Sequence, residues 1–308
     1  MIVVQDLRKL YDRNVAVDKI SFTARPGEIF GLLGPNGAGK TTTISIISGL
    51  LLPSSGSVMV NGRPISPTAA AVKAQLGVVP QETALYQDLN ARENLRFWGS
   101  LYGLGGAELK SRVQQMLEQL GLTGRAGEPV KNYSGGMKRR LNLGLGLVHD
   151  PKVVLLDEPT VGVDPQARLN ILESIRDLAS KGKTVLYTTH YLQEAEELCD
   201  RIAIMDHGRI LAEGTVGELK KRIGEGNIVT VKGGFHAQAL RDLLAGNRQV
   251  DLVSLEDHHA MLSLHDGMSP AQLLQDLMTK PLDIEEISVR EASLEQVFLK
   301  LTGGELRD

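Results

Sequence analysis

The chain has very little cysteine and almost no excess of charge. Cys199 is its one cysteine among 308 residues, so no disulfide can form within the chain, and we expect this residue to be a small part of the core. The formal net charge is only −3, which provides no strong field toward nucleic acid. The basic cluster Lys138–Arg140 is expected to form a solvated or interfacial helix face. We therefore expect no disulfide framework and no nucleic-acid partner.

Long hydrophobic runs are also missing. A membrane-spanning helix needs about 20 predominantly apolar residues. The best candidate, Ile44–Leu52, is far shorter and includes Ser45, Ser48 and Gly49. The start of the chain, Met1–Val4, lacks the basic region and extended apolar core of a secretory signal. We therefore expect a cytoplasmic chain that does not cross a bilayer, and its length allows two domains.

What the sequence does contain is a segment suited to binding phosphate. Gly34–Thr41 reads GPNGAGKT, which fits the pattern G-x-x-x-x-G-K-[ST], and it follows the apolar run Ile29–Leu33. A helical pattern from Thr41 to Leu51 completes the strand, loop and helix. Backbone N–H groups would hold the phosphates, Lys40 would add a cation, and Thr41 would ligate Mg²⁺. The predicted ATP-binding residues here are Gly34, Pro35, Asn36, Gly37, Ala38, Gly39, Lys40, Thr41 and Thr42. The alternative is an ordinary glycine-rich turn.

Two adjacent carboxylates follow a second apolar run. Val153–Leu156 is typical of a strand buried on both faces of a parallel sheet, and it ends in Asp157 and Glu158. Asp157 would reach the metal, through water, whereas Glu158 would take a proton from the attacking water. The alternative is that this pair merely ends a strand and begins a solvated loop.

A third segment, Ser134–Gly136, precedes a helical pattern. Ser134 stands where a helix N-cap belongs, and Gly135 and Gly136 leave the first amides uncovered, so this helix start attracts an anion. A chain with a complete phosphate loop does not need a second anion site for the same nucleotide. We therefore expect a second copy of the chain to use this one.

Along the chain these segments occur in the order Gly34–Thr41, Ser134–Met137 and Val153–Pro159. In that order they resemble the nucleotide-binding subunit of ATP-binding-cassette (ABC) transporters, over about Ile2–Glu218. In that family two subunits face head to tail, and each ATP lies between the phosphate loop of one and the Ser-Gly-Gly helix of the other. The resemblance implies that Tyr11 stacks on adenine, that Gln81 contacts Mg²⁺ and the attacking water, that His190 contacts the γ-phosphate, and that Asp164 crosses the dimer interface. It also implies Mg²⁺ as cofactor and a separate transmembrane permease, with the subunit peripheral on the inner face of the membrane.

Three of these implied roles have a simpler alternative. Tyr11 could be a packed aromatic at a turn, Gln81 could end the strand at Leu76–Val79, and His190 could be a structural histidine. The chain also departs from the family's usual Leu-Ser-Gly-Gly-Gln, because Tyr133 and Met137 stand at the outer positions. Met137 removes a side-chain hydrogen bond from that position but leaves the backbone amides unchanged.

The expected fold is α/β, with a P-loop NTPase core. Residues 1–222 would form the ATPase domain: a parallel sheet with flanking helices, an antiparallel β layer, and a helical arm over about 85–150. Residues 223–308 would form a small α+β domain with the order β-α-β-β-α-β. In the tail Ser293–Leu301, apolar residues share one helix face, and packing is its expected use.

The leading functional hypothesis is an ATPase subunit that dimerises around two Mg·ATP and drives export through a separate permease. Export is favoured because the C-terminal region resembles that of exporter ATPases for drugs, antibiotics and other hydrophobic compounds. The alternatives are a soluble ABC-type ATPase acting on ribosomes or DNA, an import ATPase, and a nucleotide-binding module without meaningful turnover. The second cassette is either an identical or a homologous chain.

Overall fold

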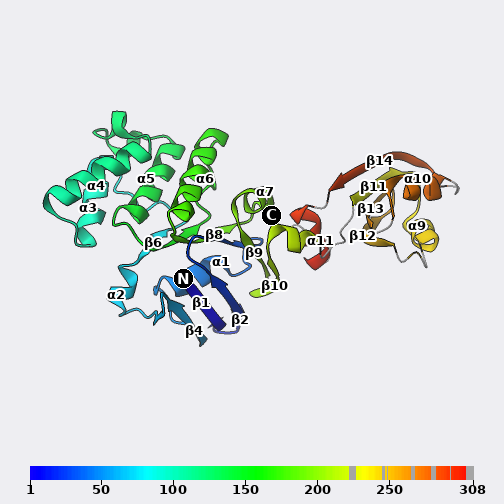
Figure 1. The fold of residues 1–308 in the computed structure, drawn as a ribbon, viewed down its shortest axis with the longest axis horizontal. Helices are drawn as coiled ribbons and strands as arrows, with labels where there is room; N and C mark the ends of the chain where they lie inside the picture. The colour runs from blue at the N-terminus through cyan, green and yellow to red at the C-terminus, as the bar shows by residue number, and fades with distance from the viewer. Residues whose placement is uncertain are drawn as a thin grey trace. The chain divides into compact units, whose positions relative to one another are not determined.

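The computed structural model describes residues 1–221, 227–244, 247, 249–264, 268–278, 282–291 and 293–302. The chain divides into two compact units, Met1–Leu211 and Ala212–Asp308, and each is described by itself (Figure 1). The domain boundary expected at residues 222 and 223 lies outside the described residues.

A six-stranded sheet forms the centre of the first unit. In spatial order its strands are β10 (Arg209–Gly214), β9 (Arg201–Asp206), β3 (Ile29–Leu33), β8 (Thr184–Thr189), β7 (Val153–Asp157) and β6 (Leu76–Val79). From β9 to β6 all neighbouring strands are parallel. Every residue of β3, β7 and β8 is buried, as expected for strands covered on both faces. The predicted parallel core is confirmed.

The register of this sheet brings four loops to one edge. Leu33 pairs with Thr189, Asp157 with Thr188, and Val79 with Leu156. Parallel strands have their carboxyl ends at the same edge, so the residues that follow β3, β8, β7 and β6 come together there. The loops after β3, β7 and β8 begin with the predicted site residues Gly34, Glu158 and His190. The loop after β6 reaches Gln81 two positions beyond the end of the strand.

An antiparallel sheet forms a second layer of the same unit. Its spatial order is β2 (Asn14–Ala24), β1 (Ile2–Tyr11), β4 (Ser55–Val60) and β5 (Arg63–Pro64). Helix α1 (Lys40–Ile47) contributes Ile44, Ile46 and Ile47 to a buried cluster that also contains side chains from both sheets. The two sheets and the helix that begins at Lys40 therefore share one core. The predicted antiparallel β layer is confirmed.

The helical arm consists of three helices gathered on one side of the first unit (Figure 1). They are α3 (Ala91–Leu101), α4 (Gly106–Gln119) and α5 (Gly135–Leu147), and α3 contacts both of the others. A capping box between Asn90 and Glu93 begins α3. The short α2 (Ala70–Lys73) precedes β6. The arm thus lies between β6 and β7 in the chain and positions the start of α5.

Two further helices connect strands of the central sheet and pack against it. Helix α6 (Pro165–Ser180) connects β7 to β8, and α7 (Leu192–Leu198) connects β8 to β9. Cys199 directly follows α7 and is buried, as predicted. Its sulfur leaves no room for a side chain at Gly31, because a Cβ there would lie 2.8 Å from Sγ. This close approach packs the end of α7 against β3.

The second unit has the predicted β-α-β-β-α-β order after α8 (Val216–Lys221). Its elements are β11 (Asn227–Gly233), α9 (Ala237–Leu244), β12 (Val250–Glu256), β13 (His259–Leu264), α10 (Pro270–Met278) and β14 (Ile284–Glu291). The antiparallel sheet has the spatial order β12-β13-β11-β14, which is the ferredoxin-like arrangement. Helices α9 and α10 share one buried cluster with this sheet.

Helix α11 (Leu294–Thr302) carries the apolar stripe noted in the tail. Leu294, Val297 and Phe298 are buried, and the helix contacts α8 and β12 of its own unit. Its expected packing role is confirmed.

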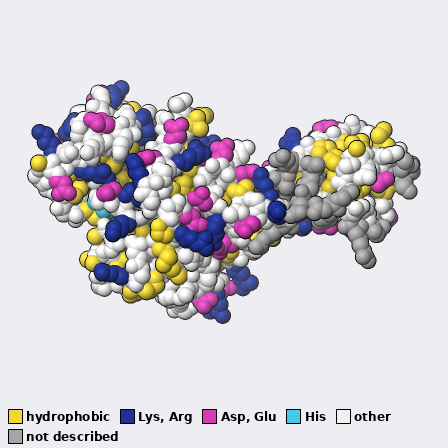
Figure 2. Space-filling model, in the orientation of Figure 1, with side chains coloured by type: hydrophobic (Ala, Val, Ile, Leu, Met, Phe, Trp, Pro, Cys, Tyr) yellow, Lys and Arg dark blue, Asp and Glu magenta, His cyan; other side chains and the backbone are white. Residues whose placement is uncertain are grey.

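The surface shows mixed charge. On the face drawn in Figure 2, lysine and arginine are interspersed with aspartate and glutamate over the first unit. In the described part of the chain, no helix has both the length and the apolar character that a membrane span requires.

Candidate nucleotide-binding and catalytic site

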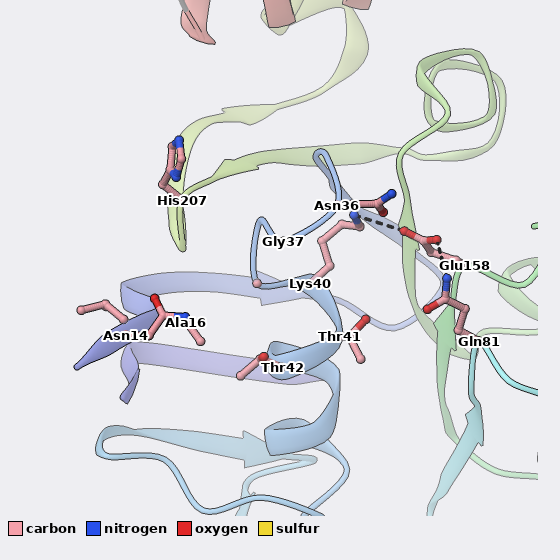
Figure 3. Close-up of a pocket in the computed structure, with 12 residues that line it drawn as sticks. Asn14, Ala16, Asn36, Gly37, Lys40, Thr41, Thr42, Gln81, Glu158 and His207 are labelled. Atoms are coloured by element: carbon pink, nitrogen blue, oxygen red, sulfur yellow. Dashed lines mark hydrogen bonds and ion pairs between the residues drawn. The ribbon is translucent and has the colours of Figure 1, made fainter. Parts of the chain in front are cut away.

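A cavity of about 340 Å³ opens at the carboxyl edge of the central sheet, over the start of α1 (Figure 3). Eight of its lining residues were predicted from the sequence: Asn36, Gly37, Gly39, Lys40, Thr41, Thr42, Gln81 and Glu158. Four others were not: Asn14, Val15, Ala16 and His207. The phosphate loop, the Gln81 segment and the end of β7 therefore meet around one space.

The loop before α1 has the backbone that phosphate binding requires. Gly37 has a φ of 81° and Gly39 a φ of 101°, both in the region where glycine is favoured. Gly39 is the N-cap of α1 and provides no side-chain hydrogen bond to it. The first N–H groups of this helix are thus available to an anion. Pro35 and Ala38 form the rest of the curve, and Ala38 is buried.

We expect Gly39→Ala to lower the free energy of unfolding more than Gly37→Ala does. Both substitutions force a left-handed backbone on alanine, which costs roughly 1–2 kcal/mol. At Gly39 the added Cβ would also overlap the carbonyl oxygen of Ala16, whereas at Gly37 nothing lies within 4 Å. Urea unfolding of the two variants measures the difference. Equal losses of unfolding free energy would show that the overlap with the Ala16 carbonyl oxygen does not destabilise the Gly39→Ala variant.

Lys40 is almost fully buried and has three oxygen neighbours. Its ammonium group donates to the carbonyl oxygen of Gly34 at 2.7 Å and to that of Pro35 at 3.0 Å. It also lies 3.2 Å from Oε1 of Glu158. The loop that would hold phosphate therefore also holds the lysine that would contact it.

Glu158 is the point at which three predicted residues meet. Besides Lys40, the amide nitrogen of Gln81 donates to Oε2 at 3.1 Å, and Nδ1 of His190 lies 3.2 Å from Oε1. Figure 3 shows Lys40 and Gln81 both turned toward this carboxylate. Glu158 is 4 % exposed, and its φ of 46° is unusual for a residue with a side chain. Strained backbone of this kind is concentrated at functional sites.

Asp157 is buried like Glu158 and accepts two hydroxyl hydrogen bonds. Thr188 Oγ1 donates to its carboxylate at 2.7 Å, and the Thr41 hydroxyl also bonds to it. Burial raises the pKa of Asp157, although both hydroxyls act in the opposite direction. A carboxylate in this state gains from a nearby cation. Together with Thr41 and the Gln81 amide oxygen, it is an oxygen donor set of the kind that Mg²⁺ prefers, so the residues present fit that ion.

Ten predicted residues do not line the cavity. Five of them contact lining residues or lie next to them in the chain: Gly34, Pro35, Ala38, Asp157 and His190. The remaining five are Tyr11 and four residues of the helix starts. Tyr11 is 44 % exposed at the end of β1, where Lys9 Nζ lies 5.1 Å from its ring centroid. The other four are Ser134, Gly135, Gly136 and Asp164. Within one chain, therefore, the Ser-Gly-Gly helix start does not line the cavity that the phosphate loop lines.

The Ser-Gly-Gly segment and Asp164 instead lie against each other. Ser134 is the predicted N-cap of α5, accepting from the Met137 N–H at 3.2 Å, and it is exposed together with Gly135. Asp164 is the N-cap of α6. A Cβ on Gly136 would lie 3.1 Å from the Asp164 carboxylate, so the two helix starts are in contact.

Sequence reasoning missed the wall of the cavity that includes His207. This residue is in the turn between β9 and β10, next to Gly208. Gly208 donates its N–H to the Ala38 carbonyl at 3.1 Å and accepts from the Asp18 N–H at 2.8 Å. The turn is therefore held between the phosphate loop and β2. The Asp-His-Gly sequence signals a turn, but it does not indicate what that turn contacts.

A second missed feature ties helix α5 to the segment that carries Gln81. The Arg139 guanidinium donates to the Gln81 carbonyl oxygen. The buried Asn142 donates to the Pro80 carbonyl at 3.2 Å and accepts from the Ala84 N–H at 3.0 Å. The helix that begins at Ser134 thus holds the backbone on both sides of Gln81.

Comparison with known proteins matches both parts of the chain. Residues 17–161 match the ABC transporter family, and residues 214–302 match the C-terminal domain of DrrA1-3-like ATP-binding proteins. The chain is 45 % identical over 312 residues to the linearmycin resistance ATP-binding protein LnrL of Bacillus subtilis, with 100 % of each chain covered. It is 37 % identical to the daunorubicin resistance ATP-binding protein DrrA3 of Streptomyces coeruleorubidus, covering 99 % of this chain and 97 % of that one.

Solved structures agree with this match. An ATP-binding subunit of an ABC transporter superposes with a TM-score of 0.67 at 32 % identity, covering 72 % of this chain and 92 % of that one. A dimeric ATP-binding cassette in a post-hydrolysis state, bound to ADP and Pi, has a TM-score of 0.65 at 25 % identity, covering 70 % and 98 %. The predicted P-loop NTPase fold is confirmed. The chain belongs to the ABC transporter family and is an ATP-binding, ATP-hydrolysing subunit with a DrrA-like C-terminal domain.

Proposed function

We propose that two copies of this chain, on the inner face of the cell membrane, power export of a drug-like, antibiotic or lipid-like compound through a separate permease. The observation that carries the proposal is similarity over the whole chain, C-terminal domain included, to proteins named for linearmycin resistance, daunorubicin resistance and Nod factor export. The substrate pathway would belong to the permease.

The site residues would then have the following roles. The phosphate loop from Gly34 to Thr42 and the Lys40 ammonium would hold the phosphates of ATP. Thr41, Asp157 and Gln81 would hold Mg²⁺, which when bound balances charge on the phosphates. Because Lys40 lies 3.2 Å from Glu158, an incoming phosphate would compete with that carboxylate for the ammonium. ATP binding would in this way release Glu158 to accept a proton from the attacking water.

His190 and Gln81 would position the water and the γ-phosphate around Glu158. Both side chains are already within 3.2 Å of that carboxylate. Tyr11 would stack on adenine, which its exposed ring permits, and its strand partner is Asn14, a residue that lines the cavity.

Residues outside the cavity would complete the site of the other subunit. Ser134, Gly135 and Gly136 begin a helix, and the first two are exposed, so their N–H groups would bind the γ-phosphate held by the partner. Asp164, in contact with the same segment, would cross the dimer interface.

Mixing two inactive variants tests the shared site. Lys40→Ala disables the phosphate loop, and Ser134→Asp keeps a good N-cap while placing a negative charge against the phosphates. Neither homodimer has an intact site, but each mixed dimer has one. We expect each variant alone to be nearly inactive and an equal mixture to recover about a quarter of wild-type ATPase activity, from the statistics of random pairing in a twofold dimer. No recovery, or full activity of Ser134→Asp alone at high dilution, would contradict the head-to-tail pair.

Purification from membranes tests the partner. The full chain should copurify with an integral membrane protein after mild detergent extraction. Copurification with ribosomes or DNA in its place would contradict the transport role.

A further inference from the structure

A buried carboxylate lies behind the cavity without lining it. Glu194, on α7, is 2 % exposed and accepts four hydrogen bonds. The donors are Tyr187 Oη at 2.6 Å, Thr160 Oγ1 at 2.9 Å, Thr189 Oγ1 at 3.1 Å and Arg168 Nε at 2.6 Å. Burying a carboxylate is costly unless it is paired and hydrogen-bonded, and here both oxygens are engaged.

The donors come from three separate parts of the first unit. Thr160 is in the loop that follows Glu158, Arg168 is in the first turn of α6, and the other two are in β8. Helix α6 begins directly after its N-cap Asp164. Glu194 therefore joins the segment carrying the proposed general base, the segment carrying the proposed interface residue, and the strand that leads to His190.

The connection to His190 is the most direct of these. The Thr189 hydroxyl donates to Glu194 and also accepts from the Tyr191 N–H at 2.9 Å, so the residues on both sides of His190 are held by one group. The Tyr191 ring lies 4.1 Å from the His190 ring, centroid to centroid, and 5.2 Å from the Arg168 guanidinium carbon. The orientation of His190 is thus linked to α6 through Glu194 and its partners.

Tyr187 keeps its hydroxyl proton and can therefore donate the hydrogen bond to Glu194. Burial, followed by the neighbouring Glu194 carboxylate, raises the pKa of the Tyr187 hydroxyl well above its usual range. Tyr187 is fully buried and therefore remains a donor to Glu194.

We propose that Glu194 is a positioning residue that makes the His190 turn, the loop after Glu158 and the Asp164 end of α6 move as one body. Contact of the second subunit with Asp164 is then transmitted to the γ-phosphate side of the site. The proposal rests on the proposed function, because it needs a dimer that closes on ATP. Glu194 itself does not line the cavity.

The first test is a comparison of two glutamates on the same helix. Glu194→Gln keeps the shape but replaces one acceptor oxygen by a donor that faces other donors. We expect kcat for ATP hydrolysis to fall roughly tenfold, which is typical when a residue that orients a functional group without touching the substrate is replaced. The Kd for ATP should change less than about twofold, because the phosphate loop is unaffected. Glu197→Gln, exposed on the same helix, should match wild type. A parallel loss of kcat, ATP affinity and melting temperature would indicate a structural role only and overturn the proposal.

The second test separates this proposal from the function on which it rests. With ATP present, Glu158→Gln should accumulate as a dimer in gel filtration, and adding Glu194→Gln should reduce the dimer fraction. If Glu158→Gln forms no ATP-dependent dimer, the proposed function fails. If the dimer forms equally well with and without Glu194→Gln, the positioning role fails. If Glu194→Gln does not fold, Tyr187→Phe takes its place, because it removes one hydroxyl that donates to Glu194. The same two measurements then test the proposal.

Discussion

Replacing Glu158 by glutamine should leave ATP binding intact and lower the rate of hydrolysis by about 10²–10⁴-fold, the usual contribution of a general base. The carboxylate is buried and is approached by Lys40, Gln81 and His190. Glutamine has nearly the same shape and can keep a hydrogen bond to Gln81, but it cannot accept the proton of the attacking water. Single-turnover release of phosphate, measured beside equilibrium binding of ATP, separates the two effects.

A matched control for this change lies on α6. Glu173 is exposed and lies outside the nucleotide cavity, so Glu173→Gln should hydrolyse ATP at the wild-type rate. Hydrolysis by Glu158→Gln within a few-fold of wild type would remove this carboxylate from the role of general base. The proton would then have to pass to another group at the site, of which His190 is the nearest alternative.

Replacing Lys40 by alanine should weaken ATP binding itself. The lysine is 5 % exposed and is held by two carbonyl oxygens of the phosphate loop, which point its ammonium toward the cavity. It would contact the phosphates in the bound ground state, so its loss acts on affinity and not only on turnover. A hydrogen bond to a charged group contributes about 1.5–3 kcal/mol, which corresponds to a roughly 10- to 100-fold higher Kd.

Isothermal titration of ATP into Lys40→Ala and wild type measures this change. Lys181→Ala is the control, because Lys181 forms an exposed ion pair with Asp177 on α6 and such pairs contribute little. An unchanged Kd for Lys40→Ala, with hydrolysis lost, would mean that the lysine acts only in the transition state. The competition proposed between phosphate and Glu158 for this ammonium would then have no basis.

Most of the candidate site could be predicted from short segments of sequence. The segment Gly34–Thr41 carries its own geometry, because its glycines, lysine and threonine act within one turn of chain. Glu158 could be found because a short apolar strand ends beside it. In contrast, no local pattern marked Glu194, His207 or Asn142, since each acts on a segment far from it in the sequence.

Taken alone, the amino-acid sequence determined the elements themselves. Short apolar runs placed strands of the parallel core, the cap at Ser134 marked one helix start, and the C-terminal β-α-β-β-α-β order followed from the pattern of apolar segments there. These signals are short-range, because a strand or helix shows its buried face in its own residues.

Only the tertiary structure decided which elements are neighbours. Placing β3 between β8 and β9, and β7 between β8 and β6, aligns the ends of strands far apart in the chain and brings Lys40, Gln81 and His190 to Glu158. The same packing collects the donors to Glu194 and presses the His207 turn against the phosphate loop. An apolar strand indicates that it will be buried, but its own residues do not determine which other apolar strand pairs with it. The choice among partners depends on how all the side chains fill the core together.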